Sequence, residues 1–402
     1  MRNRYDAPGG IMSDALASCV GDTDYFFETV LSRAHLYRPA AFDEGAVPVS
    51  TAEIDDCVTS RPLAASSVRM AKDNQLLDQK LYLMDVGPSY VGPRDTIDPV
   101  KVSRLIDAGA TLVIRPASLH LPRLRRFCKD IEMQVGQGVD ADLFITPSNA
   151  RGFEIHADAA ESLVIQLQGS KHWTLYEPVR PWEHRSFGID PPAELSPVAE
   201  YTLNPGDFLY VPRGMPHLAR TADTLSVHVT ISINAIRWSD LLTSVIQTAL
   251  GAPSFAGPVP LRDNLVSAIR EELPQQMARL GQVVQQAAAA EGVLDQILRS
   301  DDSMLDAVRS NLLSELVTGT KADVADKVRL RPGVWPVVHR GGQDTAIQTG
   351  RSRFRVSGSA ADACEVLMRA PTYVKDLAED TQAALEAVEV LFQYGIAERC
   401  PD

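Results

Sequence analysis

Two histidines and one aspartate in this 402-residue chain have the residue types and spacing of a metal site. His156 and Asp158 form an H-x-D pair, and residues i and i+2 of a β-strand point to the same face. An extended segment would therefore direct an imidazole and a carboxylate toward one point. His217 can supply a third ligand. Two histidines and one carboxylate leave further metal positions open, as in non-haem Fe(II) oxygenases.

The sequence around these residues strengthens the metal interpretation, because an isolated histidine is more often an ordinary polar residue on a half-buried strand. The segment from Gly152 to Gly169 reads G-x3-H-x-D-x2-E-x7-G, and the segment from Gly206 to His217 reads G-x5-P-x-G-x2-H. Both resemble the two motifs of the cupin superfamily. The Gly and Pro residues of the second segment predict turns that place its histidine across a barrel.

A cation for a cosubstrate follows the first motif. An Fe(II) oxygenase needs a reductant, and 2-oxoglutarate would occupy two of the open metal positions. Lys171 lies one hairpin strand after Asp158, where a buried ammonium would pair with the distal carboxylate. A solvated lysine at the Gly169–Ser170 turn is the alternative, and Arg151 or Arg213 could serve as the anchor instead.

The other histidines are expected to have structural roles. His228 lies between apolar neighbours in LSVHVTISI and is predicted to be a hydrogen-bonded core residue or to support the site. His172 alternates with Lys171, so it should face away from the pocket. No partner pattern surrounds His35, His120, His184 or His339.

Residues 141–234 must position these side chains. Short strands punctuated by Gly and Pro follow one another there, namely LFIT, ESLVIQLQG, HWTLYEP, AEYTLNPGD, FLYVP and LSVHVTISI. Such regular short strands predict a sandwich or a barrel. Before them, hydrophobic spacing predicts helices over 24–38, 98–108 and 121–135 and strands over 80–86 and 111–115.

The last 165 residues are mainly helical at first and mixed later. Helices are predicted over 238–249 and over 264–316, the latter with breaks at Pro274 and near residue 300. Five apolar residues of this region could face a partner helix or pack within the chain: Leu265, Ile269, Leu273, Met277 and Leu280. Strands over 334–339, 345–349 and 352–357, helices over 359–369, 372–379 and 381–394, and a final strand then suggest a winged helix.

Composition limits the classes of partner. The formal net charge of −13 disfavours nucleic acid as the main ligand. Residues 359–402 hold nine acidic and three basic side chains, so their winged-helix-like pattern favours protein contacts over DNA. Five scattered cysteines indicate free thiols in a reducing compartment. Neither a signal peptide nor a run of 18 apolar residues is apparent, so a cytoplasmic protein without membrane contact is expected.

The two motif-bearing stretches together resemble JmjC-type ribosomal oxygenases of the cupin superfamily, which are Fe(II)- and 2-oxoglutarate-dependent protein hydroxylases. The stretches are ITPSNARGFEIHADAAESLVIQLQGSKHWTLYEP and LNPGDFLYVPRGMPHLARTADTLSVHVTISI, and the resemblance is strongest over residues 140–235. It implies an α+β fold. The expected parts are a double-stranded β-helix (cupin or JmjC jelly roll) within residues 1–250, a helical dimerisation region over 251–322 and a winged-helix-like domain over 323–402.

The resemblance also implies the site residues. Fe(II) would be held by His156, Asp158 and His217. Lys171, in the segment before Trp173, would bind the distal carboxylate of 2-oxoglutarate. Ser232 matches a position that borders the cosubstrate, and Thr146 is predicted to bind there too.

This chain departs from many relatives at two positions. Asp142 and Phe144 stand where those relatives carry Asn and Tyr, which removes polar groups from the pocket and adds a negative charge.

The sequence thus predicts an O2-consuming oxygenase that hydroxylates a side chain of a protein or peptide. The substrate could be a basic ribosomal protein, bound by a homodimer. The alternative is a hydroxylase of a small molecule or peptide natural product in a biosynthetic pathway. A non-catalytic JmjC-like binding protein is the third, and the complete ligand set disfavours it.

Overall fold

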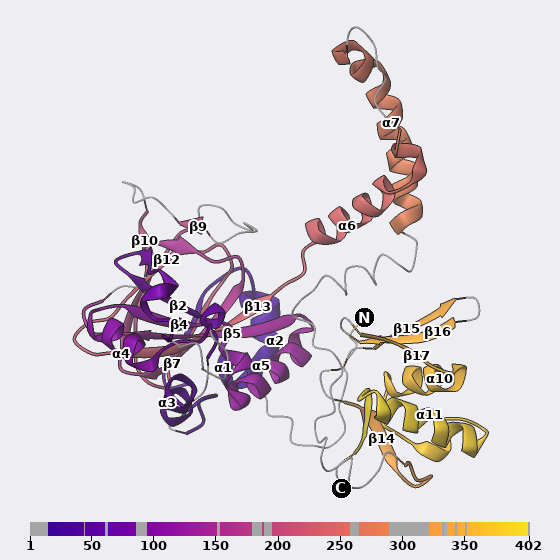
Figure 1. Cartoon of the computed structure of the whole chain (residues 1–402), viewed down its shortest axis with the longest axis horizontal. Helices are drawn as coiled ribbons and strands as arrows, with labels where there is room; N and C mark the ends of the chain where they lie inside the picture. The colour runs from indigo at the N-terminus through magenta and orange to yellow at the C-terminus, as the bar shows by residue number, and fades with distance from the viewer. Residues whose placement is uncertain are drawn as a thin grey trace. The chain divides into compact units, whose positions relative to one another are not determined.

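A computed structural model gives the fold of the chain (Figure 1). It describes residues 15–43, 45–60, 63–85, 95–150, 153–178, 187–188, 195–257, 265–288, 321–331, 334, 336–341, 344–349 and 352–400. Contacts divide the chain into two compact units. One comprises Met12–Ala235, here called the barrel unit, and the other comprises Met1–Ile11 with Ile236–Asp402, here called the C-terminal unit.

Two β-sheets form the barrel unit. The larger has the strand order β1-β11-β7-β13-β5-β4-β2-β3, and the smaller has the order β10-β8-β12-β6-β9. The strands are β1 (Leu36–Arg38), β2 (Val68–Lys72), β3 (Gln75–Leu76), β4 (Thr111–Ile114), β5 (Gly138–Thr146), β6 (His156–Ala157), β7 (Glu161–Gln168), β8 (Lys171–Tyr176), β9 (Phe187–Gly188), β10 (Pro197–Leu203), β11 (Phe208–Val211), β12 (His217–Arg220) and β13 (Ser226–Asn234). From β5 to β8 and again from β10 to β13, successive strands alternate between the two sheets, as in a jelly roll, so the predicted double-stranded β-helix is confirmed.

The outer face of the larger sheet holds the main apolar core. On β13, residues 227, 229, 231 and 233 are buried in this core, while His228, Thr230 and Ser232 point to the opposite face. Helices cover the core: α1 (Ala15–Val20), α3 (Thr51–Thr59), α4 (Pro99–Asp107) and α5 (Pro122–Val135). Each helix contributes buried side chains to the core, among them Leu16, Ile54, Val102 and Leu124.

The inner faces of the two sheets enclose a second, smaller cluster. Its buried members come from both sheets and are Val164, Trp173, Leu175, Leu203, Leu209, Val211 and Met215. Lys171 alternates in step with Trp173 on β8 and therefore faces the space between the sheets. His228 on β13 faces the same space, because its neighbours along the strand are buried in the outer core. The stabilising core and the enclosed polar residues thus lie on opposite faces of the larger sheet.

Three predicted elements of the barrel unit are confirmed and two are corrected. The predictions over 98–108, 111–115 and 121–135 match α4, β4 and α5. The helix predicted over 24–38 is shorter, since α2 (Thr23–Tyr25) continues as a π-helical turn only to Val30, and Leu36–Arg38 pairs with β11 as a strand. The strand predicted over 80–86 is wrong, because Gln79–Leu81 forms a 3-10 turn whose start is capped by the Asp78 side chain.

The C-terminal unit combines two long helices with a small mixed domain. Its elements are α6 (Trp238–Leu250), α7 (Leu265–Ala288), β14 (Lys327–Leu330), β15 (Pro336–Gly341), β16 (Asp344–Thr349), β17 (Ser352–Arg355), α10 (Gly358–Leu367), β18 (Thr372–Tyr373), α11 (Thr381–Gln393) and β19 (Ala397–Arg399). The three predicted strands, helices 238–249, 359–369 and 381–394, and the final strand are confirmed. Residues 372–379 are not helical, since β18 pairs there with β14 and a 3-10 turn follows.

Helix α7 continues through Pro274, so the predicted break there is wrong, and residues 289–316 of that predicted helix lie outside the described part. The winged-helix and dimerisation assignments, and the three-part division of the chain, stay predictions. No helix in the described ranges is both long and apolar enough to cross a membrane.

Two glycines of nearly equal φ give a test of the packing at the β7–β8 hairpin. Gly169 has φ +61°, and a Cβ built on it would lie 1.7 Å from the Leu225 carbonyl oxygen. Gly136, after α5, has φ +66°, and a Cβ there would meet nothing within 4 Å. We expect Gly136→Ala to cost about 1–2 kcal/mol of unfolding free energy for its left-handed backbone. Gly169→Ala should cost more than about 4 kcal/mol, because the backbone of Leu225 cannot move aside. Urea unfolding of both variants measures the difference, and equal losses would contradict the close approach.

Candidate metal centre and adjoining pocket

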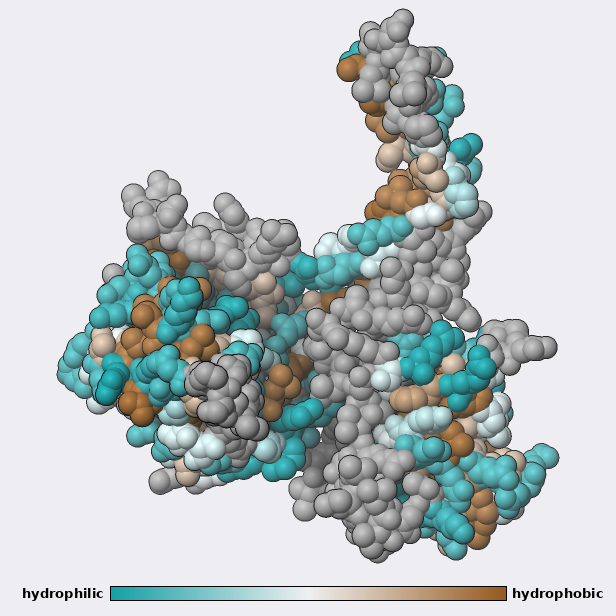
Figure 2. Space-filling model, viewed as in Figure 1, coloured by the Kyte–Doolittle hydropathy of each residue, from teal (hydrophilic) through white to brown (hydrophobic). Residues whose placement is uncertain are grey.

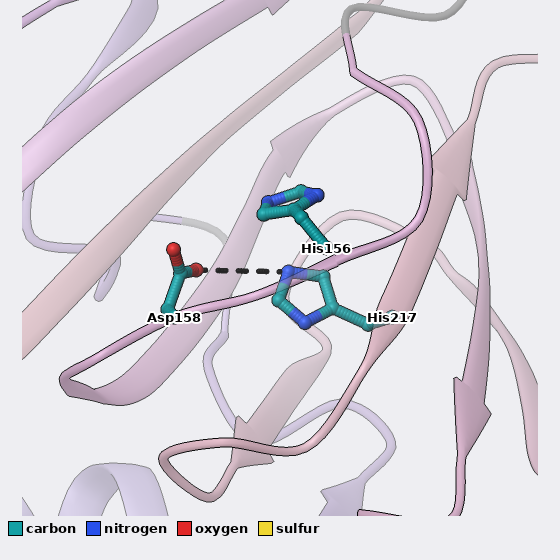
Figure 3. A group of neighbouring side chains, drawn as sticks. All are labelled: His156, Asp158 and His217. Atoms are coloured by element: carbon teal, nitrogen blue, oxygen red, sulfur yellow. Dashed lines mark ion pairs between the residues drawn. The ribbon is translucent and has the colours of Figure 1, made fainter. Parts of the chain in front are cut away.

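The three predicted metal ligands meet at the inner side of the smaller sheet. His156 on β6 pairs directly with His217 on β12, and Asp158 follows β6. One potential ligand atom from each residue lies within 4.8 Å of the others, and Figure 3 shows the three side chains converging. The backbone N–H of Gly214, in the turn before β12, donates to the Asp158 carbonyl at 2.9 Å. The turn of the second motif is therefore tied to the segment that carries the first.

Both imidazoles are oriented by hydrogen bonds to their own backbone. Nδ1 of His156 lies 2.8 Å from the Glu154 carbonyl oxygen, and Nδ1 of His217 lies 3.1 Å from that of Met215. A ring that donates Nδ1–H to a carbonyl presents the lone pair of Nε2, which is the form that binds a metal.

Electrostatics also favour a cation between these groups. Burial, and next the neighbouring His156, lower the pKa of His217 to about 4, although Asp158 acts in the opposite sense. His217 is thus neutral at pH 7, and its 3.6 Å approach to the Asp158 carboxylate is not an ion pair. A nitrogen lone pair that faces a carboxylate oxygen at this distance is stabilised by a cation. The donor set therefore fits a divalent metal.

Glu161, the glutamate of the first motif, supports the second motif instead of joining the ligands. It is buried and accepts hydrogen bonds from the hydroxyls of Tyr210 and Ser32 and from the Arg213 N–H at 3.2 Å. Arg213, one of the alternative cosubstrate anchors, lies in this network. The other alternative, Arg151, lies outside the described residues.

Lys171 and Thr146 are both buried and meet between the sheets, as the predicted cosubstrate site requires. Lys171 is 5% exposed, so the alternative of a solvated lysine is wrong. Its Nζ donates to Thr146 Oγ1 at 3.2 Å, and Thr146 also accepts from the Thr111 hydroxyl at 3.4 Å. Burial lowers the pKa of Lys171 to about 7. Within the described part of the chain no carboxylate pairs with this ammonium, so the pocket suits an anion supplied from outside.

The structure does not bring Ser232 to this pocket. Ser232 pairs with Asp140 in the β13–β5 register, whereas Thr146 pairs with Ser226 at the other end of the ladder. Six residues of β5 separate the two levels, which is about 20 Å of strand. Ser232 as a cosubstrate contact stays a prediction, and the geometry places it at the opposite end of the inner face.

Asp140 and Asp142 lie on β5 near the metal ligands, and this pair of carboxylates is here called the acidic wall. Burial raises the pKa of Asp142 to about 7, even though the Arg115 guanidinium, 3.2 Å away, favours the charged form. Asp140 and Asp158 add repulsion that raises it further. Burial likewise raises the pKa of Asp140. Oδ1 of Asp142 is buried and has no hydrogen-bond partner among the described residues, which therefore leave this pair of carboxylates incompletely neutralised.

His228, predicted to be a hydrogen-bonded core residue or to support the site, lies on the inner face together with Trp173, for which no role was predicted. His228 is buried as expected, but it stacks on Phe144, with ring centroids 4.7 Å apart, and is not hydrogen-bonded within the described residues. Trp173 meets the same imidazole edge-on at 5.7 Å. The alternation of side chains along β8 could have identified Trp173, because it places Trp173 on the same face as Lys171. His172 is exposed and faces away, as predicted.

Comparison with known proteins supports the resemblance inferred from the motifs. Residues 118–241 match the family model of the JmjC domain. Ribosomal oxygenase 2 of Bos taurus is 37% identical over 141 residues, which cover 34% of this chain and 30% of that protein. The bifunctional lysine-specific demethylase and histidyl-hydroxylase NO66 of Drosophila simulans is 33% identical over 161 residues, which cover 37% of this chain and 19% of that protein. The chain therefore spans less than a third of the length of these relatives.

The fold similarity covers nearly the whole chain. The structure of YcfD, a ribosomal oxygenase from Escherichia coli, in complex with cobalt and 2-oxoglutarate superposes with a TM-score of 0.56 at 15% identity, over 94% of this chain and 98% of that one. The chain thus contains a JmjC domain and is ribosomal oxygenase-like in sequence over that domain and in overall fold.

Removal of the Asp158 carboxylate should strongly weaken metal binding without unfolding the protein. We expect wild-type protein to bind one Mn(II) or Co(II) ion and Asp158→Ala to bind it at least about 100-fold more weakly, since one of three ligands is lost. Calorimetric titration with the metal measures this. His172→Ala, on the outward face of β8, is the matched control and should bind as wild type. Equal metal affinity in Asp158→Ala would rule out this ligand set.

Proposed function

We propose that this protein is an Fe(II)- and 2-oxoglutarate-dependent oxygenase that hydroxylates an amino-acid side chain of a protein or peptide. The observation that carries the proposal is the pairing of two sites of opposite charge preference between the sheets. His156, Asp158 and His217 suit a divalent cation, and the enclosed ammonium of Lys171, which pairs with no carboxylate of the described residues, suits a carboxylate. The similarity to proteins named ribosomal oxygenase and histidyl-hydroxylase, and to a fold that binds cobalt and 2-oxoglutarate, agrees with it.

Each residue has a distinct role in this proposal. His156, Asp158 and His217 hold the ion from one side, and Lys171 with Thr146 holds the distal carboxylate of the cosubstrate. The ion, with 2-oxoglutarate and O2, supplies the oxidising power for C–H hydroxylation. Apolar residues of the inner cluster exclude bulk water from the enclosed space.

The charges near the site favour a basic polypeptide as substrate. Asp140 and Asp142 face the inner space with raised pKa values, and a cationic side chain would stabilise their ionised forms. The chain as a whole carries −13 formal charges, which speeds the encounter with a basic partner. A basic ribosomal protein has this chemistry.

Mass spectrometry tests the function directly. Ribosomal proteins and cellular peptides from wild-type cells should include one that is heavier by one oxygen atom than its counterpart from cells lacking the gene. Complementation with wild-type protein should restore the modification, and Asp158→Ala should not. Purified wild-type protein should form succinate from 2-oxoglutarate when that substrate is present. Absence of any such mass difference, together with no substrate-stimulated succinate, would contradict the proposal.

Cosubstrate affinity should depend on pH through Lys171. The pKa of Lys171 in the free protein is about 7, and a bound dicarboxylate favours the protonated form, so binding takes up a proton above that pH. We expect the Kd for 2-oxoglutarate of the Mn(II)-loaded protein to rise by up to about tenfold per pH unit between pH 7 and 9. Lys171→Met should bind weakly and without this pH dependence. Calorimetry measures both, and a flat wild-type profile would contradict the role of Lys171.

We further propose that the C-terminal unit mediates a homodimer. Helices α6 and α7 each expose an apolar stripe at helical spacing, and Figure 2 shows brown, apolar residues along α7. The exposed residues are Trp238, Leu242, Ile246 and Leu250 on α6 and Val266, Ile269, Leu273 and Met277 on α7. Such stripes mark interaction sites, and a two-fold dimer would use the same stripe on both chains. The winged-helix-like part, residues 323–402, would then contact protein.

Charge on the α7 stripe should dissociate the dimer. We expect wild-type protein to have the mass of a dimer in multi-angle light scattering at micromolar concentration, and Leu273→Arg with Met277→Arg to have the mass of a monomer. Gln275→Arg with Gln276→Arg adds the same charge at exposed polar positions of α7 and should remain dimeric. A monomeric wild type would refute the dimer.

A further inference from the structure

Two further polar side chains near Lys171 hold buried atoms that lack a partner. Nε1 of Trp173 and Nδ1 of His228 are both buried and have no hydrogen-bond partner in the described part of the chain. Trp173 lies two residues after Lys171 on the same face of β8, and its ring meets the His228 ring edge-on at 5.7 Å. Buried polar groups of this kind are rare in folded proteins and usually indicate a ligand or an ordered water.

The His228 ring is held firmly in this position. It stacks on Phe144 with an angle of 3° between the ring planes, and Phe144 lies opposite it in the β13–β5 register. On the other side of β13, the pairing with β7 skips Leu167 between Val227 and His228, so an irregularity of β7 lies beside this residue. Irregularities of this kind are common next to active sites. Stacking and strand pairing thus hold the ring, while Nδ1 makes no hydrogen bond within the described residues.

The charge state of His228 makes it a donor toward an anion. Burial, and next the positive charge of Lys171, hold the pKa of His228 well below its usual range, so the ring is neutral. A neutral imidazole carries one N–H and one lone pair. Beside an ammonium and an indole N–H, the favourable tautomer directs its N–H into the pocket toward whatever acceptor lies there. A carboxylate is the acceptor that satisfies all of these donors together.

We propose that His228 is a binding residue of the cosubstrate pocket and that its imidazole N–H donates to the carboxylate that pairs with Lys171. Phe144 fixes the ring by stacking, and Trp173 closes the pocket on a second side. This inference rests on the proposed function for the identity of the anion, 2-oxoglutarate. The orphaned nitrogen itself is a property of the fold.

The test is equilibrium binding of 2-oxoglutarate to Mn(II)-loaded protein, which needs no turnover. His228→Phe keeps an aromatic ring that can stack on Phe144 but removes the donor, and it should raise the Kd roughly tenfold or more. His228→Asn keeps an N–H near the position of Nδ1 and should bind within about threefold of wild type. His172→Phe, on the exposed face of β8, is the matched control and should be unchanged.

Two further measurements separate ligand binding from a structural role. Oxalate can chelate the metal but has no distal carboxylate, so its Kd should be the same for wild type and His228→Phe. The ligand-free melting temperature of His228→Phe should equal or exceed that of wild type, because the variant loses a buried nitrogen that has no partner. A structural role predicts a lower melting temperature and weaker binding of both ligands.

The outcomes distinguish the two proposals. If wild-type protein binds 2-oxoglutarate and His228→Phe binds it equally well, water or another donor fills the role and the inference about His228 is wrong, while the proposed function stands. If wild-type protein binds Mn(II) but not 2-oxoglutarate, the proposed function itself fails.

Discussion

Side chains enclosed between the two sheets of the barrel unit meet little water, so each polar group there needs a partner from the protein or from a bound molecule. The Nε2 atoms of His156 and His217 face a carboxylate at one level of this space. At another level, Lys171 donates to a threonine hydroxyl, and no carboxylate of the residues that the structure describes pairs with it. The first arrangement is stabilised by a cation and the second by an anion. A chelating dicarboxylate on a metal meets both requirements with one small molecule.

The fold tolerates these unpaired groups because stability comes from elsewhere. The outer face of the larger sheet packs against four helices and forms the main core, whereas the polar residues alternate onto the inner face of the same strands. Glu161 links the main core to the metal site. Its carboxylate joins Tyr210 and Ser32 to the turn of the second motif, so the position of His217 depends on hydrogen bonds that the metal itself does not make.

Strand periodicity explains which parts of this site could be predicted. The alternation of residues gives the shared face of His156 and Asp158, and the second motif adds His217. Lys171 was inferred from its place after the first motif and from the resemblance, and Ser232 from the resemblance alone. Alternation does not give the level along a strand, and Ser232 lies about 20 Å of strand from Thr146. The orphaned nitrogen of His228 was also beyond prediction, because it depends on neighbours contributed by two other strands. Local alternation wrongly predicted a strand over residues 80–86, because the sequence of a capped 3-10 turn has a similar pattern there.

The acidic wall favours one substrate class over the other. Asp142 keeps a buried oxygen without a hydrogen bond, and its only ion-pair partner, among the described residues, is the more exposed guanidinium of Arg115. A neutral metabolite would add desolvation to this carboxylate without adding charge, which favours the protonated form. A cationic side chain would instead replace lost hydration with a charge-assisted hydrogen bond. Within the proposed function, the residue that departs from the Asn of many relatives therefore favours a cationic substrate group, which a basic polypeptide can supply.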